Sequence, residues 1–398
     1  MISWKRNVIF VIASQFFSLM GFSFAMPFVP FYFQAMGVHD QHALKIWIML
    51  FNSAAPLSLA VCSPIWGALS DRYGRRLMLL RANFGSMILL FCMGLASNPT
   101  MLVGLRVLQG VLTGTVTAAI TLASVHTPEN RSGFVLGVLS AAVNSGSMCG
   151  AFFGGLFADL FGYRVAFFAS SGILLVSALL VLLGTEEFVA KRKDSGDFSF
   201  KTSLIPKNLG EAGFILLLLC LIGFVLSFDA SWMPLLVQEI HGSLRGASFW
   251  TGLLFAAGGS AGLLAGPIIG RLADRMPPPV IARLSAIGAG FMSMAIGMAA
   301  NFPVLFGARF CGLFCAGGLD PVFQIWLSKI TPEQKRGFVF GWAATARALG
   351  WMLAPLVSGA VAWLAGLRSI FFAAAAFFFL LVPLITFIVR RLDRRNSH

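Results

Sequence analysis

Long apolar runs recur from one end of this chain to the other, and they constrain the fold more than any other feature. A helix of about 20 apolar residues crosses the ~30 Å hydrocarbon core of a bilayer. The sequence therefore predicts an all-α polytopic membrane protein with twelve transmembrane helices. They are expected at approximately residues 8–33, 45–68, 77–96, 100–124, 133–157, 165–185, 210–237, 248–270, 280–299, 303–328, 338–362 and 369–391.

The positive charge of the chain follows the loops. The net charge of +14 could suggest a nucleic-acid partner, but only 11% of the 398 residues are charged. If the N-terminus is cytoplasmic, 22 of the 29 lysines and arginines fall on the cytoplasmic side and four on the other side. This asymmetry predicts a multi-pass membrane protein with both termini in the cytoplasm. No nucleic-acid partner is expected.

The chain also repeats itself. Gly67, Asp71, Arg72 and Arg106 recur 203 residues later as Gly270, Asp274, Arg275 and Arg309. The repeat predicts two pseudo-symmetric six-helix halves, residues 1–185 and 210–398, joined by a charged cytoplasmic linker at 186–209. Parallel repeats of this kind are typical of transporters whose site lies between the halves.

A polar hairpin between the second and third spans carries a family resemblance. It resembles the G-x-x-x-D-R-x-G-R-R signature of the major facilitator superfamily, in which such residues latch the cytoplasmic ends of the two halves. The resemblance implies this role for Gly67, Asp71, Arg72, Gly74, Arg75 and Arg76. The second copy departs from the signature, because Met276-Pro277-Pro278-Pro279 replaces its last four residues.

The fifth span carries a second resemblance. Gly146, Gly150, Gly154 and Gly155 follow the helix-five signature of the twelve-helix drug:proton antiporters, although Ala151 stands where that family has proline. Small residues four apart also form a close-packing helix face. The resemblance implies alternating-access export of lipophilic or cationic small molecules across the bacterial inner membrane, with protons as the driving ion.

Five charged residues lie well inside predicted spans, away from the ends: Asp229, Arg106, Arg309, Asp320 and Arg347. Charges at this depth are costly and usually functional. Arg106 begins an R-x-x-Q-G sequence that resembles the family's motif for proton coupling. Depth along the helices predicts Asp229 near Arg309 or Arg106, and Asp320 near Arg347, with a static ion pair as the alternative for each. Burial raises the pKa of a carboxyl and a nearby arginine lowers it, so a change of conformation can move a proton.

The resemblance places the first, fourth, seventh and tenth helices around a central cavity. Polar and aromatic residues on these helices are candidates for substrate contact: Gln15, Phe22, Gln109, Phe228, Trp232, Phe323 and Gln324. The chain has no nucleotide-binding loop, no metal-ligand cluster and no nucleophile set, so neither a cofactor, a metal nor an enzyme activity is expected. The expected partners are a small-molecule substrate, protons and the lipid bilayer, with the protein as a monomer.

Two other functions stay open from the sequence. One is proton-coupled transport of a defined metabolite, such as a sugar or a siderophore. The other is a membrane enzyme or sensor built on a transporter-like frame. The short loops and the lack of a catalytic constellation argue against the second.

Overall fold

The computed structural model describes residues 4–127, 131–186, 210–273, 275–317, 319, 323, 327 and 336–396, and within these ranges it contains helices and no strands. Ten helical spans are long and apolar enough to cross a membrane. Two shorter apolar helices, Pro99–Leu112 and Phe302–Ala316, lie where the fourth and tenth spans were predicted. The predicted all-α polytopic fold is therefore confirmed.

The helices follow the predicted spans in order. Those of the first half are α1 (Trp4–Ala25), η1 (Met26–Phe28), α2 (Val29–Ala35), α3 (Gln41–Tyr73), α4 (Arg75–Gly94), α5 (Pro99–Leu112), α6 (Thr115–His126), α7 (Ser132–Phe161) and α8 (Tyr163–Gly184). Those of the second half are α10 (Gly210–Phe228), η3 (Ala230–Trp232), α11 (Met233–His241), α12 (Ala247–Ala273), α13 (Pro278–Met298), α14 (Phe302–Ala316), α16 (Arg336–Ala365) and α17 (Ser369–Asn396). The predicted linker lies outside the described residues except for Glu186.

The first and seventh spans are interrupted, although the sequence predicted continuous helices. Each passes through a short 3-10 turn, η1 or η3, and continues as a helix with a proline in its first turn, Pro30 or Pro234. Proline lacks the backbone N–H and its ring clashes with the preceding turn, so an α-helix breaks there. The two prolines are 204 residues apart, so both halves break at equivalent places.

The fourth span is interrupted as well. It breaks between α5 and α6 at Thr113 and Gly114, where the glycine has a φ of +123°. The indole Nε1 of Trp66 donates to the carbonyl of Val111 at 2.6 Å, just before the break. A side chain from α3 therefore hydrogen-bonds the backbone at this irregular turn.

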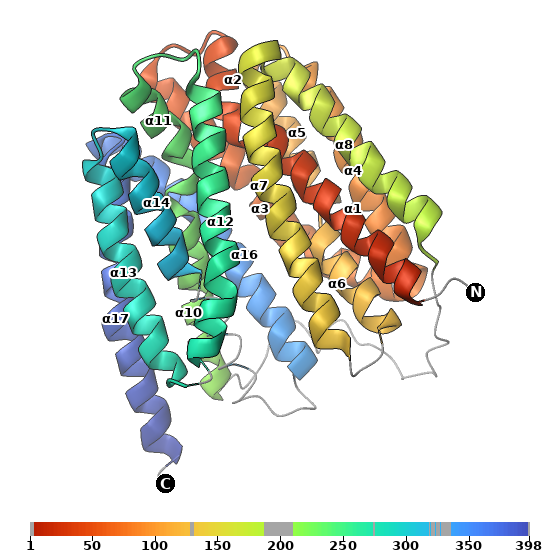
Figure 1. The fold of residues 1–398 in the computed structure, drawn as a ribbon, viewed down its shortest axis with the longest axis vertical. Coiled ribbons are helices and arrows are strands. Elements are labelled where there is room, and N and C mark those ends of the chain that lie inside the picture. Colours follow the sequence, from red (N-terminus) through yellow and green to blue (C-terminus); the bar gives the residue numbers. More distant parts are fainter. Residues whose placement is uncertain are drawn as a thin grey trace.

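Equivalent helices make equivalent contacts in the two halves. In the first half α1 packs against α7, and α4 packs against α8. In the second half α10 packs against α16, and α13 packs against α17. The halves meet where α7 packs against α12 and α3 packs against α16 (Figure 1).

The close packing of α7 against α1 depends on a glycine stripe. A Cβ atom added to Gly146, Gly150 or Gly154 would overlap the backbone carbonyl of Phe16, Met20 or Phe24, respectively. Gly155 faces α12 instead, where an added Cβ would overlap the carbonyl of Ser248. The stripe therefore lets α7 approach one helix of each half.

The two ends of the bundle differ. We call the end that carries both termini the terminal end, and the end with α2 and α11 the opposite end (Figure 1). At the opposite end, Gln34 and Gln238 exchange two amide hydrogen bonds of 2.9 Å, and Lys45 Nζ donates to the carbonyl of Ala362 at 2.9 Å. Helices α7 and α12 diverge toward the terminal end (Figure 1). The halves are thus closed against each other at the opposite end.

Candidate functional site

Asp229 lies at the break in the seventh span. Helix α10 ends at Phe228, and η3 begins at Ala230, so the backbone of Asp229 joins the two. Its carbonyl accepts from the N–H of Trp232 at 3.0 Å, while its side chain caps neither helix. The carboxylate is therefore free to turn toward a neighbouring helix.

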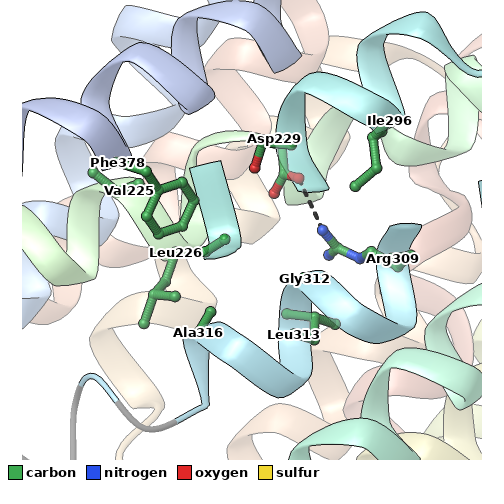
Figure 2. Close-up of a pocket in the computed structure, with 11 residues that line it drawn as sticks. Val225, Leu226, Asp229, Ile296, Arg309, Gly312, Leu313, Ala316 and Phe378 are labelled. Atoms are coloured by element: carbon green, nitrogen blue, oxygen red, sulfur yellow. Dashed lines mark hydrogen bonds and ion pairs between the residues drawn. The ribbon is translucent and has the colours of Figure 1, made fainter. Parts of the chain in front are cut away.

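That neighbour is α14, which supplies Arg309. The guanidinium Nη1 of Arg309 donates to Oδ2 of Asp229 at 2.8 Å, and each residue is only 6% exposed (Figure 2). Desolvated charges are tolerated within a membrane when they are paired. Of the two arginines expected beside Asp229, Arg309 is the one that binds it.

The ion pair borders a small cavity of about 20 Å³, which has room for about one water molecule. Ser293 and the ion pair are its polar lining groups. The full lining is Val225, Leu226, Asp229, Ala289, Ser293, Ile296, Arg309, Gly312, Leu313, Ala316 and Phe378 (Figure 2). Apart from Asp229 at the break, these residues come from α10, α13, α14 and α17, all in the second half. The pair was expected on a central cavity, but in this conformation it faces the interior of the second half.

Arg106 is the first-half counterpart of Arg309, and its surroundings differ. Its Nη1 donates to Oε1 of Gln109 and lies 3.2 Å from the sulfur of Met26. Its guanidinium also lies 4.9 Å from the centre of the Phe51 ring. Each arginine therefore points at the break in the first helix of its own half, but only the second half places an aspartate there.

A glycine explains part of this difference. Gln109, the partner of Arg106, corresponds to Gly312 in the second half, 203 residues later. Gly312 has no side-chain amide that could bind Arg309, and it lines the cavity instead. Arg309 pairs with Asp229, which stands where the first half has Ala25, so two differences between the repeats separate a neutral arginine contact from an ion pair.

The other predicted charge pair falls partly outside the described residues. Arg347 lies half-buried in α16, whereas Asp320 and the substrate candidate Gln324 lie outside the described part of the chain. The pairing of Asp320 with Arg347 remains a prediction.

The hairpin predicted as a latch joins α3 to α4. Gly74 turns the chain with a φ of +97°, and Arg75 begins α4. Arg76 donates to the carbonyl of Leu182 at 2.7 Å and to Oγ1 of Thr185 at 3.3 Å, both at the end of α8. The side chains of Asp71 and Arg72 lie outside the described part, so the latch itself remains a prediction.

Most of the predicted substrate contacts are packing groups in this conformation. The Phe228 ring lies 5.2 Å from the rings of Phe224 and Phe377, and the indole of Trp232 donates to Ser358 Oγ at 2.9 Å. Phe323 is fully buried, and Phe22 is half-buried. These residues do not line the cavity beside Asp229.

Gln15 is a different case among the substrate candidates. It is fully buried in α1, and neither its amide oxygen nor its amide nitrogen has a hydrogen-bond partner. Gln109 is also buried, but its amide oxygen accepts from Arg106. The role of both as substrate contacts stays a prediction.

The structure adds contacts that the sequence analysis missed. Gln34 and Gln238 join the halves, and Asp159 of α7 accepts from the N–H of Phe249 in α12 at 2.8 Å. The sequence held a signal for the glutamines, since Pro30 and Gln34 recur as Pro234 and Gln238, each 204 residues later. Asp159 gives no comparable signal in the sequence.

Known proteins resemble this chain over almost its full length. Residues 11–300 and 251–398 match the Major Facilitator Superfamily. The chain is 32% identical over 393 residues to multidrug resistance protein MdtG of Proteus mirabilis (strain HI4320), and this alignment covers 97% of this chain and 96% of that relative. It is 34% identical over 381 residues to MdtG of Rahnella sp. (strain Y9602), and this alignment covers 94% of this chain and 91% of that relative.

Solved transporter structures share the fold. A mutant of the nucleoside transporter NupG superposes with a TM-score of 0.79 at 12% identity, over 96% of this chain and 99% of that chain. A bacterial homologue of the human lysosomal transporter Spinster, in an inward-facing and unoccupied conformation, gives 0.75 at 16% identity, over 97% of both chains. The chain is therefore a multi-pass membrane transporter rather than an enzyme, and it belongs to the Major Facilitator Superfamily.

Proposed function

We propose that this transporter exports lipophilic or cationic small molecules across the bacterial inner membrane in exchange for protons. The observation that carries the proposal is the buried ion pair of Asp229 and Arg309. The named relatives support the substrate class, because they are called multidrug resistance proteins. The division of basic residues supports a cytoplasmic location for the terminal end.

Asp229 is the proposed proton carrier. In the conformation closed at the opposite end, its charge balances that of Arg309 in an apolar interior. Protonation of the carboxyl would leave Arg309 as a buried cation without a counter-charge, which is strongly unfavourable. A conformation that hydrates Arg309 then becomes relatively more stable, so proton binding shifts the balance between the two states.

Arg106 is the second charged residue that we assign to proton coupling. It holds a positive charge at the equivalent place of the first half, and its partners among the described residues are neutral. Within the described part of the chain, one arginine of the site therefore has a titratable partner and the other has neutral partners. Asp320 and Arg347 are proposed as an ion pair that stabilises the second half.

The test is a resistance screen in a bacterial strain that lacks its major efflux pumps. Cells expressing the wild-type protein are expected to tolerate several unrelated lipophilic compounds, and to extrude ethidium in a way that a protonophore abolishes. Asp229→Asn should lose this protection at equal expression, while Asp40→Asn, which keeps the cap of α3, should retain it. Protection against a single compound would favour a transporter of a defined metabolite instead.

A further inference from the structure

The first turn of α12 is capped by the other half of the molecule. Oδ2 of Asp159, near the end of α7, accepts from the N–H of Phe249 at 2.8 Å. The first N–H groups of a helix have no partner within the helix, and a side-chain oxygen usually satisfies one of them. Here that oxygen comes from a helix of the first half, across the interface.

Three other helices that begin at the same end supply their own caps. Ala43 in α3 bonds Asp40 at 2.7 Å, Met101 in α5 bonds Asn98 at 2.8 Å, and Val304 in α14 bonds Asn301 at 3.1 Å. In each helix the capping residue stands three positions before the bonded N–H. The residue three positions before Phe249 is Gly246, which has no side chain to offer.

The backbones beside this contact approach closely. A Cβ on Gly155 of α7 would overlap the carbonyl of Ser248, and one on Gly252 of α12 would overlap the carbonyl of Ala151. This crossing brings the last turn of α7 against the first turn of α12. Tyr163, which begins α8, adds a hydrogen bond of 3.3 Å from its hydroxyl to that of Ser248.

We propose that Asp159 is a positioning residue for alternating access, because it provides the cap that α12 lacks only while the halves are closed at the opposite end. When the halves separate there, α12 loses its cap and the carboxylate loses its N–H partner. The attraction between a carboxylate and the positive end of a helix dipole adds to the hydrogen bond. The contact therefore favours the closed state without touching substrate or Asp229.

The experiment measures the distance between the halves at this end. Spin labels are placed on His39→Cys and Ser243→Cys, two exposed positions after α2 and α11, with the six native cysteines replaced by serine. Double electron–electron resonance in lipid nanodiscs reports the closed and open populations. This readout needs neither proton nor substrate, so its result is independent of the proposed export function.

Asp159→Ala is expected to shift the ratio of open to closed molecules about tenfold toward open, as for the loss of an ordinary cap. Asp159→Asn should keep most of the closed population, since an amide oxygen caps as well as a carboxylate and only the attraction to the helix dipole is lost. The matched control is Asp40→Ala, which removes a cap at the same end but within one half, and should leave the ratio unchanged. If Asp159→Ala does not yield monodisperse protein, Asp159→Leu replaces it, because leucine has a similar size and no oxygen that could cap α12.

Three results would overturn the proposal. The first is an unchanged distance distribution in Asp159→Ala or Asp159→Leu. The second is an equal shift in Asp40→Ala, which would make the effect one of general stability. The third is a shift in Asp159→Asn as large as in Asp159→Ala, because charge rather than capping would then hold the halves together.

Discussion

The carboxylate of Asp229 and the guanidinium of Arg309 neutralise each other's charge in an apolar interior, where Ser293 is the other polar residue of the cavity lining. Arg309→Gln should therefore destabilise the protein by about 3–5 kcal/mol, because it leaves a buried carboxylate unpaired. Adding Asp229→Asn should recover much of that loss, since two neutral amides can bond each other. Thermal unfolding of the two single variants and the double variant in detergent measures this coupling. Strictly additive losses would show that the two residues stabilise the fold independently.

Ser293 provides a separate test of the cavity beside the ion pair. Its hydroxyl is one of the few polar groups that can hold a water molecule next to Asp229. Ser293→Ala should slow proton exchange several-fold while leaving the unfolding temperature unchanged. Ser285→Ala, in the same helix but outside the cavity lining, is the control. Equal rates in both variants would indicate that protons reach Asp229 by another path.

At this scale the sequence predicted the partners but not their surroundings. Counting residues along the helices placed Asp229 and Arg309 at similar depths, and they bind each other. The direction in which the pair faces depends on the break at Asp229, which turns its side chain toward α14. Depth along an ideal helix carries no information on such a turn.

At the scale of the element, the glycine stripe of α7 decides how closely the helices pack. Gly150→Ala should lower stability by about 1–3 kcal/mol, because the new methyl group meets the rigid backbone of α1 at Met20. Gly137→Ala in the same helix meets no atom within 4 Å and should be neutral or slightly stabilising. Thermal unfolding of the two variants distinguishes packing from helix propensity. A similar change in both would contradict the packing role.

The sequence predicted the spans well because their number and order follow from length and hydrophobicity, which a bilayer constrains strongly. It missed the interruptions, since prolines are common in transmembrane helices and do not always break them. Pro30 and Pro234 break their spans at equivalent places of the repeat. The recurrence of a proline 204 residues later was the signal in the sequence that could have indicated the two breaks. The break at Thr113 and Gly114 involves Trp66 from another helix, a contact that local sequence does not reveal.

At the scale of the whole molecule, the charge asymmetry predicts which end faces the cytoplasm. A single cysteine at Ser243, exposed at the opposite end, should react in intact spheroplasts with an impermeant thiol reagent. One at Ser195, in the predicted linker, should react only after the membrane is opened. Both positions are labelled in the background without native cysteines. The reverse pattern would invert the proposed orientation.

Proton-driven export by the proposed mechanism depends on Asp229 as the group that carries the proton. The most direct measurement is proton release from purified protein in proteoliposomes when an exported compound, such as ethidium, is added. The wild-type protein and Asp40→Asn should release protons, and Asp229→Asn should release none although it still binds the compound. Normal proton release by correctly folded Asp229→Asn would contradict the claim and would transfer the role to another acid, with Asp320 the next to test.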